Sequence, residues 1–67
     1  MMLDFYVSKS YPGDDLDKEI IVAKFDNLID SKQFAHLKSN IFPSLVWRAK
    51  RDVQVDDYFY QGGKKIN

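Results

Sequence analysis

The chain has 67 residues, with ten basic and ten acidic side chains, one histidine, no cysteine and 45% hydrophobic residues. This composition excludes a disulfide framework, a zinc site built from Cys or His pairs, and a disordered segment, which would be less apolar. A chain this short forms one small domain with a limited core, and its scattered charges leave no apolar run of about 20 residues for a membrane span. We therefore expect a single domain over 1–67 that is not an enzyme, binds no cofactor and no metal, and works in the cytoplasm, since no secretion signal is evident.

A first strand is predicted over residues 2–9. Leu3, Phe5 and Val7 alternate with polar or amphipathic neighbours, which is the period of a strand with one face on a core. The following stretch, 10–15, contains Pro12 and Gly13 and two aspartates, and this combination predicts a turn.

Residues 15–30 fit two structures. As a helix, the segment places Ile21, Phe25 and Leu28 on one stripe, with acidic residues near its start. As a strand, the β-branched run 20–22 alternates between two faces and a turn follows at 26–27. The sequence does not decide between them.

A short helix is predicted next, capped by Asp30 or Ser31 and extending to about Lys38. Its apolar residues Phe34, Leu37 and Ile41 recur at three- and four-residue spacing, as on the core-facing side of a helix. Asn40 suits a left-handed exit, and Pro43 prevents continuation.

The period of two returns over 45–60 and predicts a hairpin that turns near 51–52. We expect Trp47 to be buried as a core anchor. On the second strand we expect Phe59 to point inward and Tyr58 and Tyr60 to point outward. Residues 61–67 show no pattern and are predicted to form a flexible tail.

These elements predict an α+β fold: an antiparallel sheet, made of the N-terminal strand and the C-terminal hairpin, with one or two helices packed on one face.

Two chemical patterns give little support for a metal site or a catalytic site. The acidic stretch 14–19 resembles part of a calcium loop, but the loop positions that need Gly and Glu hold Ile20 and Asp26. His36 has no Ser, Cys or second His in a recognisable arrangement around it. The sequence therefore predicts no metal site and no catalytic residue.

Charge is unevenly distributed along the chain. Up to Asp30 there are seven acids and three bases, and beyond it the numbers are reversed. The basic clusters around 48–51 and 64–65 raise the alternative of a nucleic-acid-binding module. This alternative is less favoured, because strand alternation puts Trp47 on one face of its strand and Arg48 and Lys50 on the other.

The favoured interpretation is a small protein-binding domain, acting as a regulator, inhibitor or accessory subunit that occupies the surface of a partner protein. Surplus aromatic residues are typical of protein interfaces, and a homodimer through the Tyr58 and Tyr60 face or its neighbouring edge would cover them. The predicted partner-binding surface combines the outward tyrosines with flanking charges: Arg48, Lys50, Asp56, Asp57, Tyr58 and Tyr60.

Overall fold

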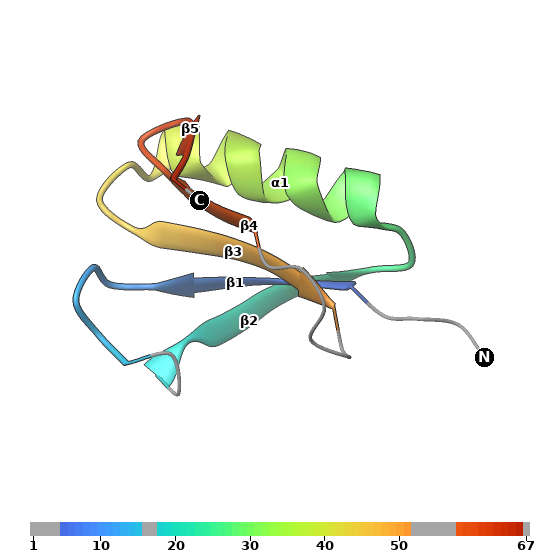
Figure 1. Cartoon of the computed structure of the whole chain (residues 1–67), viewed down its shortest axis with the longest axis horizontal. Coiled ribbons are helices and arrows are strands. Elements are labelled where there is room, and N and C mark those ends of the chain that lie inside the picture. Colours follow the sequence, from blue (N-terminus) through green and yellow to red (C-terminus); the bar gives the residue numbers. More distant parts are fainter. Residues whose placement is uncertain (1–4, 16–17, 52–57, 67) are drawn as a thin grey trace.

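The structure, a computed structural model, describes residues 5–15, 18–51 and 58–66. Its elements, in chain order, are β1 (Phe5–Ser10), β2 (Ile20–Phe25), α1 (Leu28–Ile41), β3 (Val46–Arg51), β4 (Tyr58–Gln61) and β5 (Lys64–Lys65). The strands form one sheet in the order β2-β1-β3-β4-β5, and each neighbouring pair is antiparallel. The helix α1 packs on one face of this sheet (Figure 1), which confirms the predicted α+β arrangement.

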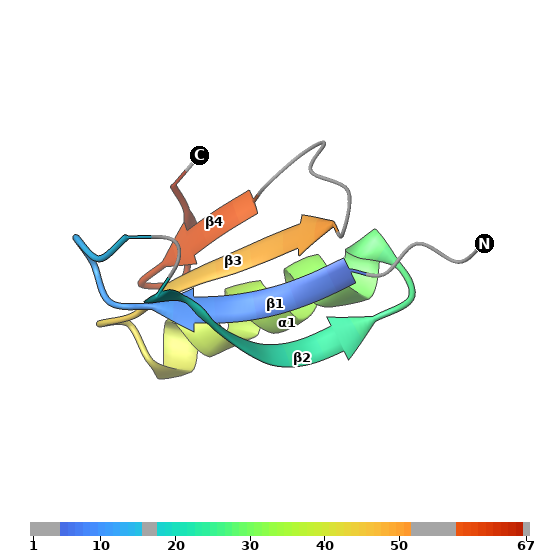
Figure 2. The same cartoon turned by 90° about the horizontal axis from the view of Figure 1, so that it is seen from below.

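The first strand agrees with its prediction where it is described. β1 is an interior strand of the sheet, between β2 and β3, and Val7 is fully buried. Residues 2–4, which the prediction included, lie outside the described residues. Figure 2 views the sheet from the side away from α1, and we call this side the far face.

The ambiguous segment contains a strand. β2 pairs with β1 from Ile20 opposite Lys9 to Phe25 opposite Phe5, and the β-branched residues at its start suit this extended backbone. Val22 is an extra residue on β2, because Ala23 faces Val7 and Ile21 faces Ser8. This bulge gives the edge strand its local irregularity.

The helix begins earlier and ends later than predicted. Asn27 is the N-cap, and its side-chain oxygen accepts a 2.9 Å hydrogen bond from the Asp30 backbone N–H. At the other end Phe42, with φ −123°, replaces the predicted left-handed exit at Asn40, and its N–H donates to the Lys38 carbonyl. Phe42 precedes Pro43, which disfavours helical backbone at that position.

The C-terminal hairpin is present as an antiparallel β3–β4 pair. The predicted turn near 51–52 cannot be compared, because 52–57 lie outside the described residues. The predicted orientation of the second strand was wrong: Tyr60 pairs with buried Trp47 and is 5% exposed, while Phe59 pairs with Arg48 on the far face. The prediction extended one alternation through 52–57, and the register of β4 on β3 does not follow it.

The predicted C-terminal tail is also corrected over its described part. Gly62 and Gly63 have φ values of 62° and 79°, and they connect β4 to β5 so that Gln61 faces Lys64. Two residues with positive φ form the hairpin turn that matches the twist of antiparallel strands. The Gly-Gly pair at this point was therefore a hairpin signal.

The core lies between α1 and the sheet, and it is small. Its buried members are Val7, Ala35, Trp47, Ala49 and Tyr60. The burial of Trp47, at 3% exposure, confirms its predicted role as an anchor.

The helix buries small side chains. Ser31, Ala35 and Ser39 are fully buried at four-residue spacing, and the two serine hydroxyls donate 2.7 Å hydrogen bonds to carbonyls three residues earlier. Such small residues let the helix approach the aromatic rings of the sheet closely. Of the large apolar side chains of α1, Phe34 packs against the core, whereas Ile29, Leu37 and Ile41 are exposed.

Candidate functional site

The residues predicted to bind a partner do not form one surface. Arg48 and Lys50 belong to the far face, whereas Tyr60 is buried under α1 and Tyr58 is half-buried beside it. The remaining two, Asp56 and Asp57, lie outside the described residues. The geometric reason for joining the tyrosines to Arg48 and Lys50 was therefore wrong.

The basic clusters are divided as well. Lys64 pairs with Gln61, which follows buried Tyr60 and so belongs to the far face with Arg48. Lys65 pairs with Tyr60 instead, and its Nζ lies 5.2 Å from the centre of the Tyr58 ring on the helix side. The clusters around 48–51 and 64–65 thus do not present their cations in a single row.

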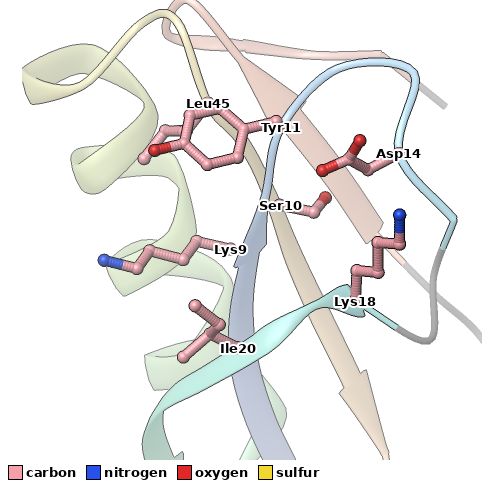
Figure 3. A pocket seen from close by; sticks show the side chains of 7 residues that line it. All are labelled: Lys9, Ser10, Tyr11, Asp14, Lys18, Ile20 and Leu45. Atoms are coloured by element: carbon pink, nitrogen blue, oxygen red, sulfur yellow. The ribbon is translucent and has the colours of Figure 1, made fainter.

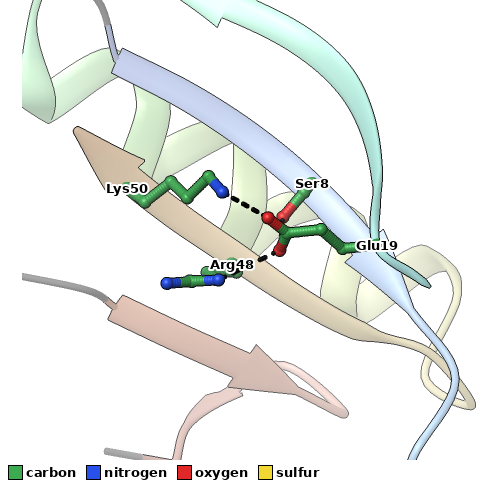
Figure 4. A network of polar contacts seen from close by, with 4 residues as sticks. All are labelled: Ser8, Glu19, Arg48 and Lys50. Carbon is green, nitrogen blue, oxygen red and sulfur yellow. Dashed lines mark hydrogen bonds and ion pairs between the residues drawn. The ribbon is translucent and has the colours of Figure 1, made fainter. Parts of the chain in front are cut away.

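A polar network on the far face connects β1, β3 and the residue that precedes β2 (Figure 4). The Glu19 carboxylate accepts a 2.7 Å hydrogen bond from the Ser8 hydroxyl and forms ion pairs with Arg48, at 3.2 Å, and with Lys50. The side chains of Glu19 and Arg48 are only 11% and 8% exposed. Glu19 therefore ties the start of β2 to β1 and β3.

The charge state of Glu19 follows from these partners. Burial favours the neutral acid and by itself raises the pKa of Glu19. Hydrogen bonds from Lys50 and Ser8, with the positive charges of Arg48 and Lys50, outweigh burial and hold the pKa below its usual value of 4.5. The carboxylate is thus ionised at neutral pH, and the network is primarily structural.

A cavity of about 270 Å³ lies where β1 ends (Figure 3). Its lining comes from the end of β1, the turn after it, the start of β2 and the residue before β3, namely Lys9, Ser10, Tyr11, Asp14, Lys18, Ile20 and Leu45. Lysines and an aspartate share the lining with apolar groups. No catalytic arrangement follows from this mixture.

One flank of α1 is closed by the chain itself, and we call it the closed flank. His36 stacks on Tyr60 with ring centres 5.4 Å apart, and His36 Nε2 lies 2.8 Å from the Gly63 carbonyl oxygen. Lys32 Nζ lies 4.2 Å from the centre of the Tyr58 ring. The Gly63 N–H donates a 3.1 Å hydrogen bond to the Ser39 hydroxyl. His36 is thus a packing residue on this flank.

The opposite flank follows β2. Phe34 marks it, because its ring lies 5.4 Å from that of Phe25 at the end of β2. Leu37 and Ile41 follow Phe34 at spacings of three and four residues, and so extend the same side of the helix. They are 58% and 54% exposed. This side of the helix is therefore apolar and uncovered by the described chain.

The edge strand adds to that surface. Ile20, Ile21 and Val22 are exposed on β2, which pairs with β1 alone among the described strands. The helix α1 runs in the direction opposite to β2 across one face of the sheet and contacts this strand (Figures 1 and 2). We call this surface the β2 flank and define it by Ile20, Val22, Leu37 and Ile41; Ile21 pairs with Ser8 and so belongs to the far face.

A second helical repeat in the sequence points to the β2 flank, and apolar periodicity alone does not reveal it. The stripe through Phe34, Leu37 and Ile41 was interpreted as the core-facing side of the helix. The small residues Ser31, Ala35 and Ser39 repeat every four positions, and this stripe is the buried one. A helix with two such stripes can bury one against its own sheet and leave the other exposed.

Within residues 5–15, 18–51 and 58–66, no helix is long and apolar enough to cross a membrane. The same residues contain no group of three or more His, Asp or Glu side chains arranged to hold a metal ion. Comparison of the chain with protein-family models, with curated proteins and with solved structures gave no match.

Proposed function

We propose that this chain is a small non-enzymatic protein-binding domain that works in the cytoplasm and acts by occupying the surface of a partner protein, as a regulator, inhibitor or accessory subunit. One observation carries the proposal: α1 buries its small side chains and exposes Leu37 and Ile41 beside the apolar edge strand β2. A contiguous exposed apolar surface of this kind is typical of interaction sites.

The balance of buried and exposed apolar groups supports the same function. In the described residues the exposed large hydrophobic side chains outnumber the large ones in the core; they are Tyr11, Ile20, Ile21, Val22, Ile29, Leu37, Ile41, Phe42 and Ile66. A domain this small is marginally stable by itself, so covering the four side chains of the β2 flank in one interface would stabilise it.

A matched pair of variants tests the proposal. Leu37→Glu places a charge on the β2 flank, and Ile29→Glu places one on an exposed site of the same helix outside it. Each protein is immobilised on a resin and incubated with an extract of its native cells. The Leu37→Glu variant should fail to capture proteins that the wild type and Ile29→Glu capture. Equal retention by all three would contradict a binding role for the β2 flank.

A nucleic-acid-binding module is the second candidate, and the far face favours it. Strand pairing assigns Lys24, Lys50 and Lys64 to this face, together with Tyr6 and Phe59. Arg48 lies on the same face but is nearly buried and paired with the Glu19 carboxylate. Cations and aromatic rings on a sheet are the groups that bind single strands.

Fluorescence anisotropy with a labelled single-stranded oligonucleotide tests this second function. Binding should weaken steeply with added salt and should be reduced by Lys24→Glu but not by Lys32→Glu, which lies on the helix side. Salt-independent binding, or equal loss in both variants, would contradict recognition by the far face.

A further inference from the structure

We propose that the cavity at the end of β1 binds a small organic acid, namely a molecule with an apolar body and one carboxylate group. The proposal goes beyond the protein-binding function, because the cavity shares only Ile20 with the β2 flank. The ligand is therefore a second kind of partner for the chain, at a separate site.

The cavity exists because β1 extends past the start of β2. β2 begins at Ile20, opposite Lys9, so Ser10 continues beyond the paired part of β1 and β2. In Figure 3, Ile20 lies at one end of the cavity and Tyr11 and Leu45 lie at the other. The volume of about 270 Å³ is just below the range of about 300–1,000 Å³ that is usual for drug-sized ligands. The occupant is therefore a small molecule.

A tight turn forms one wall of the cavity. Pro12 and Gly13 are its central residues, and Gly13 has a φ of 88°. The Asp14 N–H donates a 3.1 Å hydrogen bond to the Tyr11 carbonyl. Proline followed by a residue with positive φ is typical of a type II turn. The turn therefore fixes the backbone positions from which Tyr11 and Asp14 reach the cavity.

Charged groups line the cavity without pairing with one another. Lys9, Lys18 and Asp14 all contribute to the lining, and in the described chain none of the three forms an ion pair. In Figure 3, Lys9 lies on one side of the cavity, and Lys18 and Asp14 lie on the other. Each ammonium group ends a flexible aliphatic stem, so it can turn towards a ligand. The lining thus offers an excess of one positive charge.

That excess selects a ligand with a single negative charge. A carboxylate carries one negative charge near neutral pH, whereas a phosphate group carries about −1.5 to −2 and would be repelled more strongly by Asp14. The apolar body of the ligand contacts Ile20 and Leu45, as is usual in small-molecule sites. Tyr11 is 68% exposed, so an aromatic ring of the ligand can stack on it. Phenylacetate combines these properties and serves as the probe.

Titration of the isotope-labelled full chain, followed by the amide chemical shifts in NMR spectra, tests the proposal. Phenylacetamide has the shape of phenylacetate without its charge, and phenethylamine carries the opposite charge. Phenylacetate should shift the amides of the lining residues saturably, with a dissociation constant on the order of 1 mM, and both other compounds should bind about fivefold more weakly or worse. No saturation by about 10 mM phenylacetate, or equal binding of all three compounds, would overturn the proposal.

Two substitutions with opposite expected effects locate the site. Lys18→Gln removes a cation from the lining and should weaken phenylacetate binding by about threefold to tenfold. Asp14→Asn removes the carboxylate and should strengthen binding by about twofold to threefold. Lys64→Gln is the matched control, because Lys64 is an exposed lysine on β5, at the other end of the sheet from β2.

All three substituted side chains are exposed, so the variants should keep the fold, and circular dichroism checks this. Equal affinities of Lys18→Gln and Lys64→Gln for phenylacetate would place the ligand outside the cavity and overturn the proposal.

The ligand site and the protein-binding function fail independently. Leu37→Glu, which should fail to capture partner proteins, should bind phenylacetate as the wild type does, because Leu37 is not part of the lining. Loss of phenylacetate binding in Leu37→Glu would overturn the assignment to the cavity. Unchanged capture of proteins together with unchanged phenylacetate binding would overturn the role of the β2 flank and leave the ligand site supported.

Discussion

The two flanks of α1 differ in what covers them. On the closed flank, His36 and Lys32 contact the tyrosines of β4, and the Ser39 hydroxyl accepts a hydrogen bond from the Gly63 N–H in the turn before β5. On the β2 flank, the contact of Phe34 with Phe25 is followed by Leu37 and Ile41, which the described chain leaves exposed. A single helix thus serves as the wall of a core on one side and as a surface for contact on the other.

Removing the buried tryptophan of the core should have the largest effect on stability. Trp47 lies under α1, and its indole N–H donates to the Phe42 carbonyl at 3.3 Å. Trp47→Ala should lower the free energy of unfolding by about 3–5 kcal/mol, which approaches the whole stability of a small domain. Chemical denaturation followed by circular dichroism measures this, and an unchanged midpoint would contradict the core described here.

The link between β2 and the rest of the sheet can be broken at Glu19. Glu19→Gln should cost about 1–3 kcal/mol at pH 7, because the nearly buried Arg48 guanidinium loses its carboxylate partner. Denaturation of both proteins at several pH values separates this effect from a change in packing.

The pH dependence has a defined sign. Because the folded pKa of Glu19 lies below its usual 4.5, its ionisation stabilises the fold above that pH, and the contribution is lost as pH falls through the folded pKa. The advantage of wild type over Glu19→Gln should therefore be constant from pH 7 to about 5 and shrink below 4.5. An advantage that grows at low pH would contradict the network.

Substitution of Gly63 tests how closely the turn before β5 packs against α1 on the closed flank. A Cβ at Gly63, in its positive-φ conformation, would overlap the side-chain amide of Asn40 on α1. Gly63→Ala should cost about 1–2 kcal/mol. Gly62→Ala is the control, because it has positive φ but open space around its Cβ, and its cost should be smaller. Thermal denaturation compares the two variants, and the reverse order would exclude close packing of the turn on α1.

Two neighbouring positions on the helix give the smallest and most direct contrast. His36→Ala removes the stack on Tyr60 and the contact with Gly63, so it should lower stability by about 0.5–1.5 kcal/mol. Leu37→Ala, on the β2 flank, should change monomer stability by less than about 0.5 kcal/mol. Measurements on dilute protein keep self-association out of the comparison.

Local sequence signals predicted much of this fold. Alternation around Val7 and Trp47 placed both residues in the core, and Pro43 ended the helix as expected. The segment around β2 stayed ambiguous because short β-branched runs suit both a strand and a helix, and pairing with β1 decided it. Tyr60 was assigned to the wrong face because side-chain alternation depends on strand register, which a sequence does not fix across a long connection.

The candidate site was harder to predict because it depends on which of two helix stripes is buried. Periodicity identified Leu37 and Ile41 as a stripe but assigned them to the core. The bulky rings of Trp47 and Tyr60 occupy the space under α1, and they leave room for Ser31, Ala35 and Ser39 rather than for larger side chains. That competition for volume is a tertiary effect, which local patterns do not contain.

The position of β1 between β2 and β3 also has a consequence for how the chain folds. The β1–β2 and β4–β5 hairpins and the helix join residues close in sequence, but β1 pairs with β3 across most of the chain, with Phe5 opposite Arg51. Closing so long a loop costs entropy before its contacts form, so formation of the β1–β3 ladder should limit the folding rate. Substitutions such as Ala49→Gly, in the middle of that ladder, should therefore slow folding, whereas changes at the β4–β5 turn should mainly accelerate unfolding.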